Sequence, residues 1–286
     1  MALNIRTNMP SITAQKHLGS STRALHTAFE RLSSGLRINR AMDDAAGLAI
    51  AESLKADARI ASVAIRNAND GVSIIAIADG AIGQITNILS RLGELAEQSA
   101  NGVYGNDQRS ALQLEFTALM SEMERIAMTT EFNGTRVLSG GATVAFQVGF
   151  DGSSMSRITY SGVQATLSDL GLAAANSSIH TYSVSGATQA ASMSAARLAI
   201  DAINAAIVSV TRNRGTLGAA ESRLDITIRN LMVARENFTA AESRIRDADI
   251  AMEAANLTRL TILQQAGTAI LAQANQQPQL ALQLLG

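Results

Sequence analysis

A row of apolar residues at intervals of seven runs through the last third of the chain. Its large members are Leu217, Leu224, Leu231, Phe238, Ile245 and Met252. Three residues after each comes a smaller one, namely Ala220, Thr227, Ala234, Ala241, Ala248 and Ala255, and Ile262 closes the series. A narrow stripe of this kind predicts one long helix, which at 1.5 Å per residue spans roughly 70 Å. Such a helix needs a partner of similar length.

Residues 44–100 supply that partner. Their apolar row has the same spacing and consists of Leu54, Ala61, Ala68, Ile75, Ile82, Leu89 and Ala96. Glycines interrupt the predicted helix at Gly47, Gly71, Gly80, Gly83 and Gly93. Each costs about 1 kcal/mol relative to Ala in a helix interior. We therefore expect another helix to approach closely at these glycines, and packing rather than propensity to stabilise the pair.

The middle of the chain predicts a shorter helix and then a change to strands. A helical stripe consists of Leu112, Phe116, Leu119, Met123 and Ile126. Alternation in 144–148, a turn at Asp151-Gly152 and the apolar 158–160 predict a β-hairpin, and a second strand pair is expected around 179–184. The predicted fold is mainly α: a long antiparallel coiled-coil-like helical rod with a small β-hairpin region between its halves. We expect the rod core to contain Leu54, Ile75, Ile82, Leu89, Leu217, Leu224, Leu231, Phe238 and Ile245.

Near the N-terminus, one helix is predicted to end and another to begin within residues 33–44. Ser33-Ser-Gly35 interrupts the first helix, and 39–44 offers capping groups for the second. The adjacent acids Asp43 and Asp44 resemble a metal-binding or catalytic pair. Neighbours on a helix point about 100° apart and do not converge, so we interpret them as caps.

Residues 260–286 contain no charged residue, although they are rich in Leu, Ile, Ala and Gln. An exposed apolar stripe without charge is an association surface or an aggregation hazard. We expect both ends of the chain to become ordered when other copies cover them, which indicates polymerisation. The predicted self-assembly residues are Leu18, Leu25, Leu32, Leu36, Ile262, Leu263, Ile270, Leu271, Leu284 and Leu285.

Composition argues against several functions. The net charge of −1 and the lack of a basic block disfavour nucleic-acid binding. Without cysteine, disulfides, cysteine-ligated metals and thiol catalysis are excluded. Three scattered histidines and the lack of hydrolase, zinc-protease and P-loop motifs leave no candidate catalytic, metal or cofactor residue. No uninterrupted apolar run reaches membrane length, and the start shows no cleaved signal of the Sec type.

The stretch Arg31-Leu-Ser-Ser-Gly-Leu-Arg-Ile-Asn-Arg40, continued to Ala51, resembles the N-terminal signature of bacterial flagellin. Arg40 and Met42 replace the Ser and Lys common there. Further motifs that resemble the family follow in family order: Asn67–Val72, Gln98–Gly102, Arg125–Ala127, Phe132–Gly134, Leu217–Ala219, Ser243–Asp249, Ile262–Gly267, Ala272–Asn275 and Leu284-Leu285. The resemblance covers about 1–150 and 195–286.

This resemblance implies a structural subunit that polymerises into the flagellar filament for swimming, in a short form without large outer domains. Residues 1–44 with 247–286 would form an inner tube, and 45–246 a surrounding rod with β-hairpins at about 130–190. The subunit would be an extracellular homopolymer. It would be exported without a cleaved signal peptide by the flagellar export apparatus, with an export chaperone, and assembled under a filament cap. Neither a membrane nor a nucleic acid is an expected partner.

Other readings remain open at this point. A hook–filament junction protein shares the terminal helices of the family, although it usually matches the internal motifs less well. A coiled-coil adaptor unrelated to flagella would also show heptads. The uncharged tail disfavours it, as do the small residues that stand three positions after each large residue of the apolar row. An enzyme lacks the residues to build a site.

The resemblance also implies recognition by an innate immune receptor of the Toll-like class. Arg91, Leu95 and Glu115 match the patch through which such receptors bind flagellins. Gly93 stands where a second Arg is often found. The alternative is that these residues serve subunit packing alone, since a hot-spot Arg and a packing Arg look alike in sequence.

Overall fold

The structure is a computed structural model that describes residues 7–139, 143–174 and 179–283. It divides into two compact units. The terminal unit contains residues 1–58 and 236–286, and the rod unit contains residues 59–235. This division falls inside two long helices, whereas the expected layers, 1–44 with 247–286 and 45–246, follow helix ends. Those layers stay a prediction about the filament.

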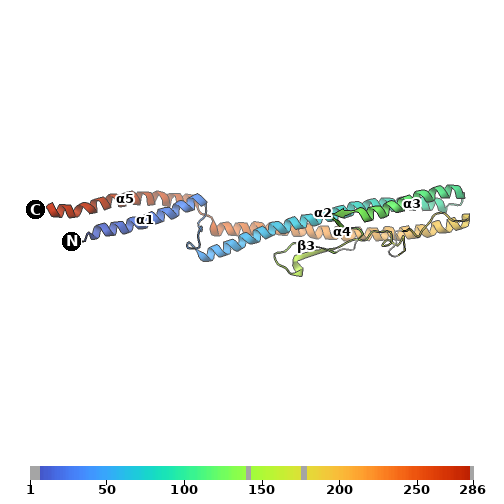
Figure 1. The fold of residues 1–286 in the computed structure, drawn as a ribbon, viewed down its shortest axis with the longest axis horizontal. Coiled ribbons are helices and arrows are strands. Elements are labelled where there is room, and N and C mark those ends of the chain that lie inside the picture. The colour runs from blue at the N-terminus through green and yellow to red at the C-terminus, as the bar shows by residue number, and fades with distance from the viewer. Residues whose placement is uncertain (1–6, 140–142, 175–178, 284–286) are drawn as a thin grey trace. The chain divides into compact units, whose positions relative to one another are not determined.

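Two long helices form the rod unit, as the two apolar rows predict. They are α2 (Ala45–Ala100) and α4 (Gln189–Arg246), and both continue into the terminal unit. Figure 1 shows them side by side and antiparallel, with α3 (Asn106–Thr129) against them. The predicted core residues Ile75, Ile82, Leu89, Leu217, Leu224 and Leu231 are buried, as are Phe116 and Met123 of α3. Leu54, Phe238 and Ile245 are half-buried and belong to the terminal unit.

Two small hairpins follow α3. In the predicted one, β3 (Thr143–Gln147) pairs antiparallel with β4 (Arg157–Ser161), and the short 3-10 helix η1 (Ser154–Ser156) precedes β4. Phe146 lies opposite Ile158, and both are buried against the rod core.

The other hairpin joins β1 (Glu131–Phe132) to β2 (Thr135–Arg136) and was not predicted. Its turn places Asn133 at φ 48° and Gly134 at φ 76°, which is the geometry that Asn-Gly favours between paired strands. The expected strand pair around 179–184 is wrong. In the described part of this segment, a single bridge joins Ala173 to His180.

The terminal unit pairs α1 (Met9–Ser34) with α5 (Ile250–Gln283). Gly35, at φ 72°, ends α1 and donates its N–H to the Arg31 carbonyl at 2.8 Å. The connector 35–44 then leads to α2. Asp44 caps α2 as expected, because its Oδ1 accepts the Gly47 N–H at 2.9 Å.

The single helix expected from Leu217 to Ile262 is wrong, because the chain leaves the helix at 247–249. There Ala248 donates its N–H to the Gly35 carbonyl at 2.9 Å, and Leu36 forms a bridge with Asp247. Asp249 then starts α5, its carboxylate accepting N–H groups from Ala251 and Met252. Pairing with the other connector and a new helix cap explain the break.

We expected no segment apolar enough for a membrane, yet α2 and α4 are long and apolar enough to cross one by length and composition. A long core helix has the same properties. In this chain the apolar rows of α2 and α4 pack against each other in the rod core.

Candidate self-assembly site

The fully buried side chains of α1 and α5 are small or polar. In these two helices the buried residues with described side chains are Ser11, Ala28, Glu253 and Ala274. The Ser11 hydroxyl donates to Asn275 Oδ1 at 2.7 Å, just beyond Ala274. Because burial of large apolar side chains is the main stabilising term in folding, this pair contributes little stability alone.

The predicted self-assembly residues with described side chains divide into a half-buried group and an exposed group. The half-buried members are Leu18, Leu25, Leu32, Leu36 and Leu271. The exposed members are Ile262, Leu263 and Ile270, with 60%, 49% and 59% of their surface accessible. Leu284 and Leu285 lie outside the described residues. One subset is therefore partly covered within the described chain, and the other remains available to another molecule.

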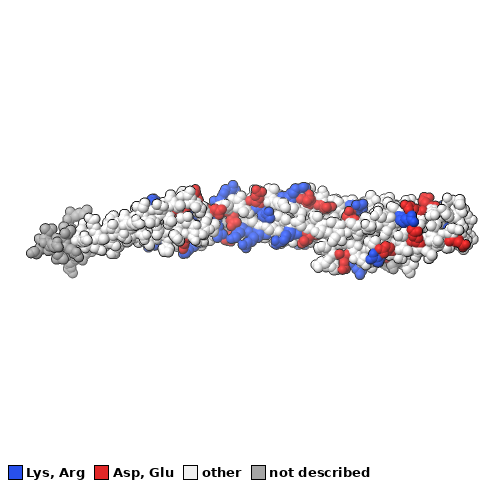
Figure 2. Space-filling view, turned by 90° about the horizontal axis from the view of Figure 1, so that it is seen from above, with Lys and Arg blue, Asp and Glu red and all other residues white. Residues whose placement is uncertain are grey.

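Helices α1 and α5 lie close together at Gly267. A Cβ added at Gly267 of α5 would lie 3.4 Å from Leu18 Cδ1 of α1, which is an ordinary contact with the end of a flexible side chain. The surface around this contact is nearly free of charge. Figure 2 shows few Lys, Arg, Asp or Glu side chains toward the chain ends, in keeping with a chain uncharged after Arg259. An apolar surface of this kind costs little to desolvate when another molecule covers it.

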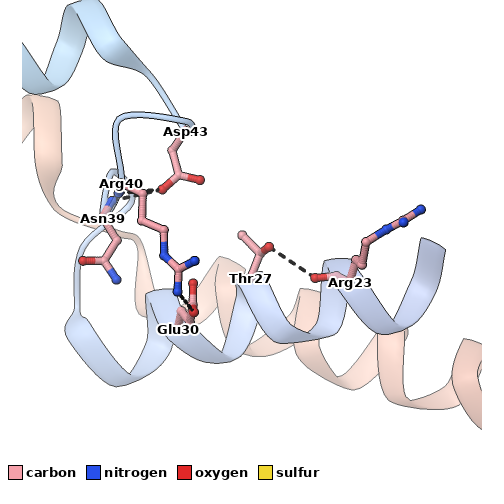
Figure 3. A network of polar contacts seen from close by, with 6 residues as sticks. All are labelled: Arg23, Thr27, Glu30, Asn39, Arg40 and Asp43. Atoms are coloured by element: carbon pink, nitrogen blue, oxygen red, sulfur yellow. Dashed lines mark hydrogen bonds and ion pairs between the residues drawn. The ribbon is translucent and has the colours of Figure 1, made fainter. Parts of the chain in front are cut away.

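Charged residues gather instead at the connector, as Figure 3 shows. Asp43 accepts the N–H groups of Arg40 at 3.0 Å and Asn39 at 3.2 Å, and Arg31 lies 3.9 Å away. The Arg40 and Asn39 N–H groups and the nearby Arg31 guanidinium hold the pKa of the Asp43 carboxyl below its usual value, although partial burial opposes them. The Arg40 guanidinium contacts Glu30 of α1. This side chain, a departure from the family pattern, therefore links the connector to α1.

A second set of contacts joins the other connector to the same unit. The Arg37 guanidinium donates to the Ile245 carbonyl at 2.6 Å, and the Arg37 backbone N–H donates to the Arg246 carbonyl. Arg246 also forms an ion pair with Glu52 at 2.7 Å. Sequence reasoning missed these roles, since the partners are far apart in the chain and no local pattern marks them.

The residues matched to receptor recognition lie in the rod unit. Arg91 forms ion pairs with Glu115 of α3 and Glu94 of α2, both at 2.8 Å. These three side chains are exposed. Leu95 is only 1% exposed and belongs to the core, so it does not share their surface.

The rod unit offers open grooves as candidate binding surfaces. Among residues 7–139, 143–174 and 179–283, no three His, Asp or Glu side chains come together to hold a metal ion. Three hollows of the rod unit are open grooves rather than closed cavities. Proteins associate with one another through extended surfaces of this kind.

Two family descriptions match the chain. "Bacterial flagellin N-terminal helical region" matches residues 5–143, and "Bacterial flagellin C-terminal helical region" matches residues 200–285. A flagellin from Halalkalibacterium halodurans is 44% identical, over 98% of this chain and 99% of its own length. The flagellar filament 33 kDa core protein of Treponema phagedenis is 38% identical, with the same coverage of both chains.

Longer relatives match as well. Flagellin D of Vibrio cholerae is 33% identical over 100% of both chains, in an alignment of 377 residues. The crystal structure of Bacillus cereus flagellin, 26% identical, covers 58% of this chain and 88% of its own, with a TM-score of 0.48.

The two matched regions include both paired helices of the terminal unit and most of the rod. The 286-residue chain is therefore a short form without a large outer domain. The chain belongs to the bacterial flagellin family, and it is a structural subunit of the flagellar filament.

Proposed function

We propose that copies of this subunit polymerise chiefly through the terminal unit. The exposed Ile262, Leu263 and Ile270 support this proposal, because they form an apolar surface on a helix with few internal contacts. In this arrangement 1–44 and 247–286 form the inner tube of the filament, and 45–246 forms the surrounding layer. A head-to-tail contact that does not close produces a filament rather than a ring.

The single observation that carries the proposal is the uncharged, half-exposed stripe of α5. A helix with this surface gains most of its apolar burial from other molecules, since α1 covers one side only. Burial of one Ile side chain against another subunit stabilises the contact by about 1.5–3 kcal/mol. Each such side chain therefore raises the affinity between subunits about tenfold or more.

The test compares full-length protein with a truncation that ends at Leu260, each seeded with short filaments and followed by electron microscopy and sedimentation. We expect long uniform filaments from the full chain and none from the truncation. Ile270→Asp is the finer variant, and it should raise the critical concentration for assembly about tenfold or more.

The matched control is Thr268→Asp, which adds the same charge at an exposed position of α5 on another side of the helix. Its critical concentration should stay closer to that of the full-length protein. A full-length chain that remains a defined small oligomer contradicts the proposal. If Ile270→Asp and Thr268→Asp raise the critical concentration equally, the apolar stripe of α5 is not the assembly surface.

We further propose that this subunit reaches the cell exterior through the flagellar export apparatus, with an export chaperone and a filament cap as transient partners, and without a cleaved signal peptide. It would act as a structural protein without enzymatic activity. Recognition by a Toll-like receptor would rest on the exposed Arg91 and Glu115, with Leu95 supporting them from the core. Arg91→Ala should then reduce signalling in receptor-reporter cells more than Arg125→Ala, which removes another exposed arginine, on α3.

A further inference from the structure

Five places in the chain have an asparagine or an aspartate directly before a glycine. In this context the side-chain carbonyl carbon is open to attack by the next backbone nitrogen, because glycine has no side chain to hinder the approach. Asparagine is for this reason among the thermolabile residues of proteins. The five places are Asp70-Gly71, Asp79-Gly80, Asn101-Gly102, Asn133-Gly134 and Asp151-Gly152. They look alike in sequence, so the structure decides which of them can react.

The three aspartates are held in place. Asp70 and Asp79 lie inside α2, where regular helical hydrogen bonds keep the next backbone nitrogen away from the side chain. The Asp151 carboxylate accepts hydrogen bonds from the hydroxyls of Ser153 and Ser156. An ionised carboxylate is also a poor electrophile compared with an amide. The two asparagines are therefore the candidates for reaction.

Asn101 is restrained on both sides of its peptide bond with Gly102. The Arg109 guanidinium donates to the Asn101 carbonyl at 2.9 Å, and Gln189 Nε2 donates to the Gly102 carbonyl at 2.7 Å. The Asn101 Oδ1 accepts the Val103 backbone N–H at 3.2 Å. These contacts must break before the Gly102 nitrogen can reach the Asn101 Cγ, so the fold protects this asparagine.

Asn133 has no comparable restraint. It is exposed in the turn between β1 and β2, and no hydrogen bond or ion pair among the described residues involves its side chain. It is also the only non-glycine residue with a positive φ, 48°, among those that the structure describes, a conformation that costs an L-residue free energy. A Cβ added at Gly134 would meet nothing within 4 Å, so the turn projects into open space.

The hairpin around Asn133 can open at low free energy. Its ladder consists of two residue pairs, Glu131 with Arg136 and Phe132 with Thr135. A ladder this short is only marginally stable. A hollow of about 180 Å³ lies beside it, lined in part by Ile74 of α2, so packing does little to hold the turn. Opening frees the Asn133 backbone to bring its Cγ to the Gly134 nitrogen.

We propose that Asn133 is a site of spontaneous deamidation in the folded chain. The Gly134 backbone nitrogen attacks the Asn133 Cγ, and the new C–N bond closes a cyclic imide. The Cγ–Nδ2 bond breaks, and ammonia leaves with the proton of the Gly134 amide. Water then opens the imide at one of its two carbonyls, which yields aspartate or isoaspartate. The reaction requires no reagent other than water.

Isoaspartate changes the hairpin more than aspartate does. It adds a methylene group to the main chain, and a two-residue turn joins its strands only in a narrow range of geometries. At the base of this hairpin the Val137 backbone N–H donates to the Thr130 carbonyl at 3.2 Å. Hydrogen exchange of the Val137 amide therefore reports whether the modified turn loosens the hairpin.

Peptide mass spectrometry measures the reaction at both asparagines in one sample. The full-length monomer is kept at mildly alkaline pH, in native buffer and in urea, and is then digested with trypsin. Cleavage after Arg125 and Arg136 releases a peptide in which Asn133 has the sole side-chain amide. In native buffer we expect Asn133 to react at least about tenfold faster than Asn101, and in urea we expect the two rates to agree within about twofold.

Two results of this experiment overturn the inference. Equal rates at Asn133 and Asn101 in native buffer would mean that the contacts of Asn101 give no protection. An Asn133 that stays intact in native buffer while it reacts in urea would mean that the hairpin protects it.

Arg109→Lys tests the protection of Asn101 directly. It should speed deamidation at Asn101 about threefold or more and leave the rate at Asn133 within about twofold. Arg125→Lys is the matched control and should change neither rate. An unchanged rate at Asn101 in Arg109→Lys, with unchanged helix content by circular dichroism, overturns the protective role of these contacts.

Asn133→Asp separates the two products, because it carries the aspartate without the added methylene group. Exchange of the Val137 amide should be faster in the aged, isoaspartate-containing chain than in freshly prepared Asn133→Asp. Equal exchange in these two samples overturns the loosening of the hairpin by isoaspartate.

Discussion

The glycines of α2 have different surroundings, although their sequence contexts look alike. A Cβ at Gly71 would lie 3.1 Å from Leu224 Cδ1 and 3.2 Å from the Phe146 ring. At Gly80 and Gly83 an added Cβ would meet nothing within 4 Å. The expectation that glycines mark close approach is therefore confirmed within the chain at Gly71 and wrong at the other two.

Alanine substitutions should separate these two situations. Gly80→Ala should raise the free energy of unfolding by about 0.5–1 kcal/mol, because it improves helix propensity without a clash. Gly71→Ala should be at least about 1 kcal/mol less stable than Gly80→Ala, because its methyl group presses on a packed ring. Urea denaturation of the monomers measures both. Equal stability of the two variants would contradict the close contact at Gly71.

Asp43 gives a pH-dependent prediction. The pKa of the Asp43 carboxyl is lower in the folded state than in the unfolded chain. Its contribution to the free energy of unfolding is therefore present above the unfolded pKa of about 3.9 and is lost as the pH falls through the folded pKa. Asp43→Asn should therefore speed amide hydrogen exchange in 35–48 several-fold at pH 7, relative to the unmodified chain. The difference should shrink below about pH 4.

Asp57→Asn on α2 serves as the control, since it removes a carboxylate from the same unit without disturbing the connector. Its exchange in 35–48 should match that of the unmodified chain at both pH values. A pH-independent effect of Asp43→Asn would mean that shape, and not charge, decides the role of this residue.

At the scale of elements, a buried arginine joins the ends of three helices. Arg109, in the first turn of α3, is fully buried and donates to the carbonyls of Asn101 and Gln189, both at 2.9 Å. Asn101 follows α2, and Gln189 begins α4. The ion pairs of the described residues do not include Arg109, so these carbonyls are the partners seen for its charge.

Arg109→Lys should lower the free energy of unfolding by about 1–3 kcal/mol, because a single ammonium group cannot reach both carbonyls in the geometry of the guanidinium. Arg125→Lys, on the same helix but exposed, should leave it almost unchanged. Urea denaturation gives both values, and limited proteolysis shows whether the 101–105 turn opens. If Arg109→Lys is as stable as the unmodified chain, the two hydrogen bonds contribute little to the free energy of unfolding.

The helices and their cores could be predicted because periodicity is a local property. Ile75 and Leu224 stand in regular rows, and burial follows from those rows. The break at 247–249 could not be found this way, because Ile245 and Met252 keep the spacing of seven across it. The break depends on pairing with 35–37, some 200 residues away, and on the cap at Asp249.

The candidate site was predictable to a similar degree. The uncharged tail identified Ile262 and Ile270 as candidates for association, since lack of charge can be counted. The connector contacts of Arg40 and Arg246 and the buried Arg109 could not be found, because they depend on which distant carbonyls and carboxylates the fold brings near.

For the whole molecule, burial is distributed unevenly between the two units. The main apolar cluster lies entirely in the rod unit, from Ala64 to Leu231. The helices of the terminal unit bury small and polar residues instead. Regions with few buried apolar contacts open at low free energy.

Hydrogen exchange of the monomer should therefore be fast throughout α1 and α5 and slow in the core of α2 and α4. In the filament, α1 and α5 should gain protection of about a hundredfold or more, because neighbouring copies cover them. Exchange of residues 82–92 serves as the internal reference and should change little. Strong protection of α5 already in the monomer would contradict the view that association orders the terminal unit.

The chain crosses the boundary between its two units twice, and both crossings lie inside helices, in α2 and in α4. A domain held by one flexible peptide is joined to its neighbour by backbone without regular hydrogen bonds. At both crossings in this chain the backbone is instead that of a continuous α-helix, so the link between the two units is itself made of secondary structure.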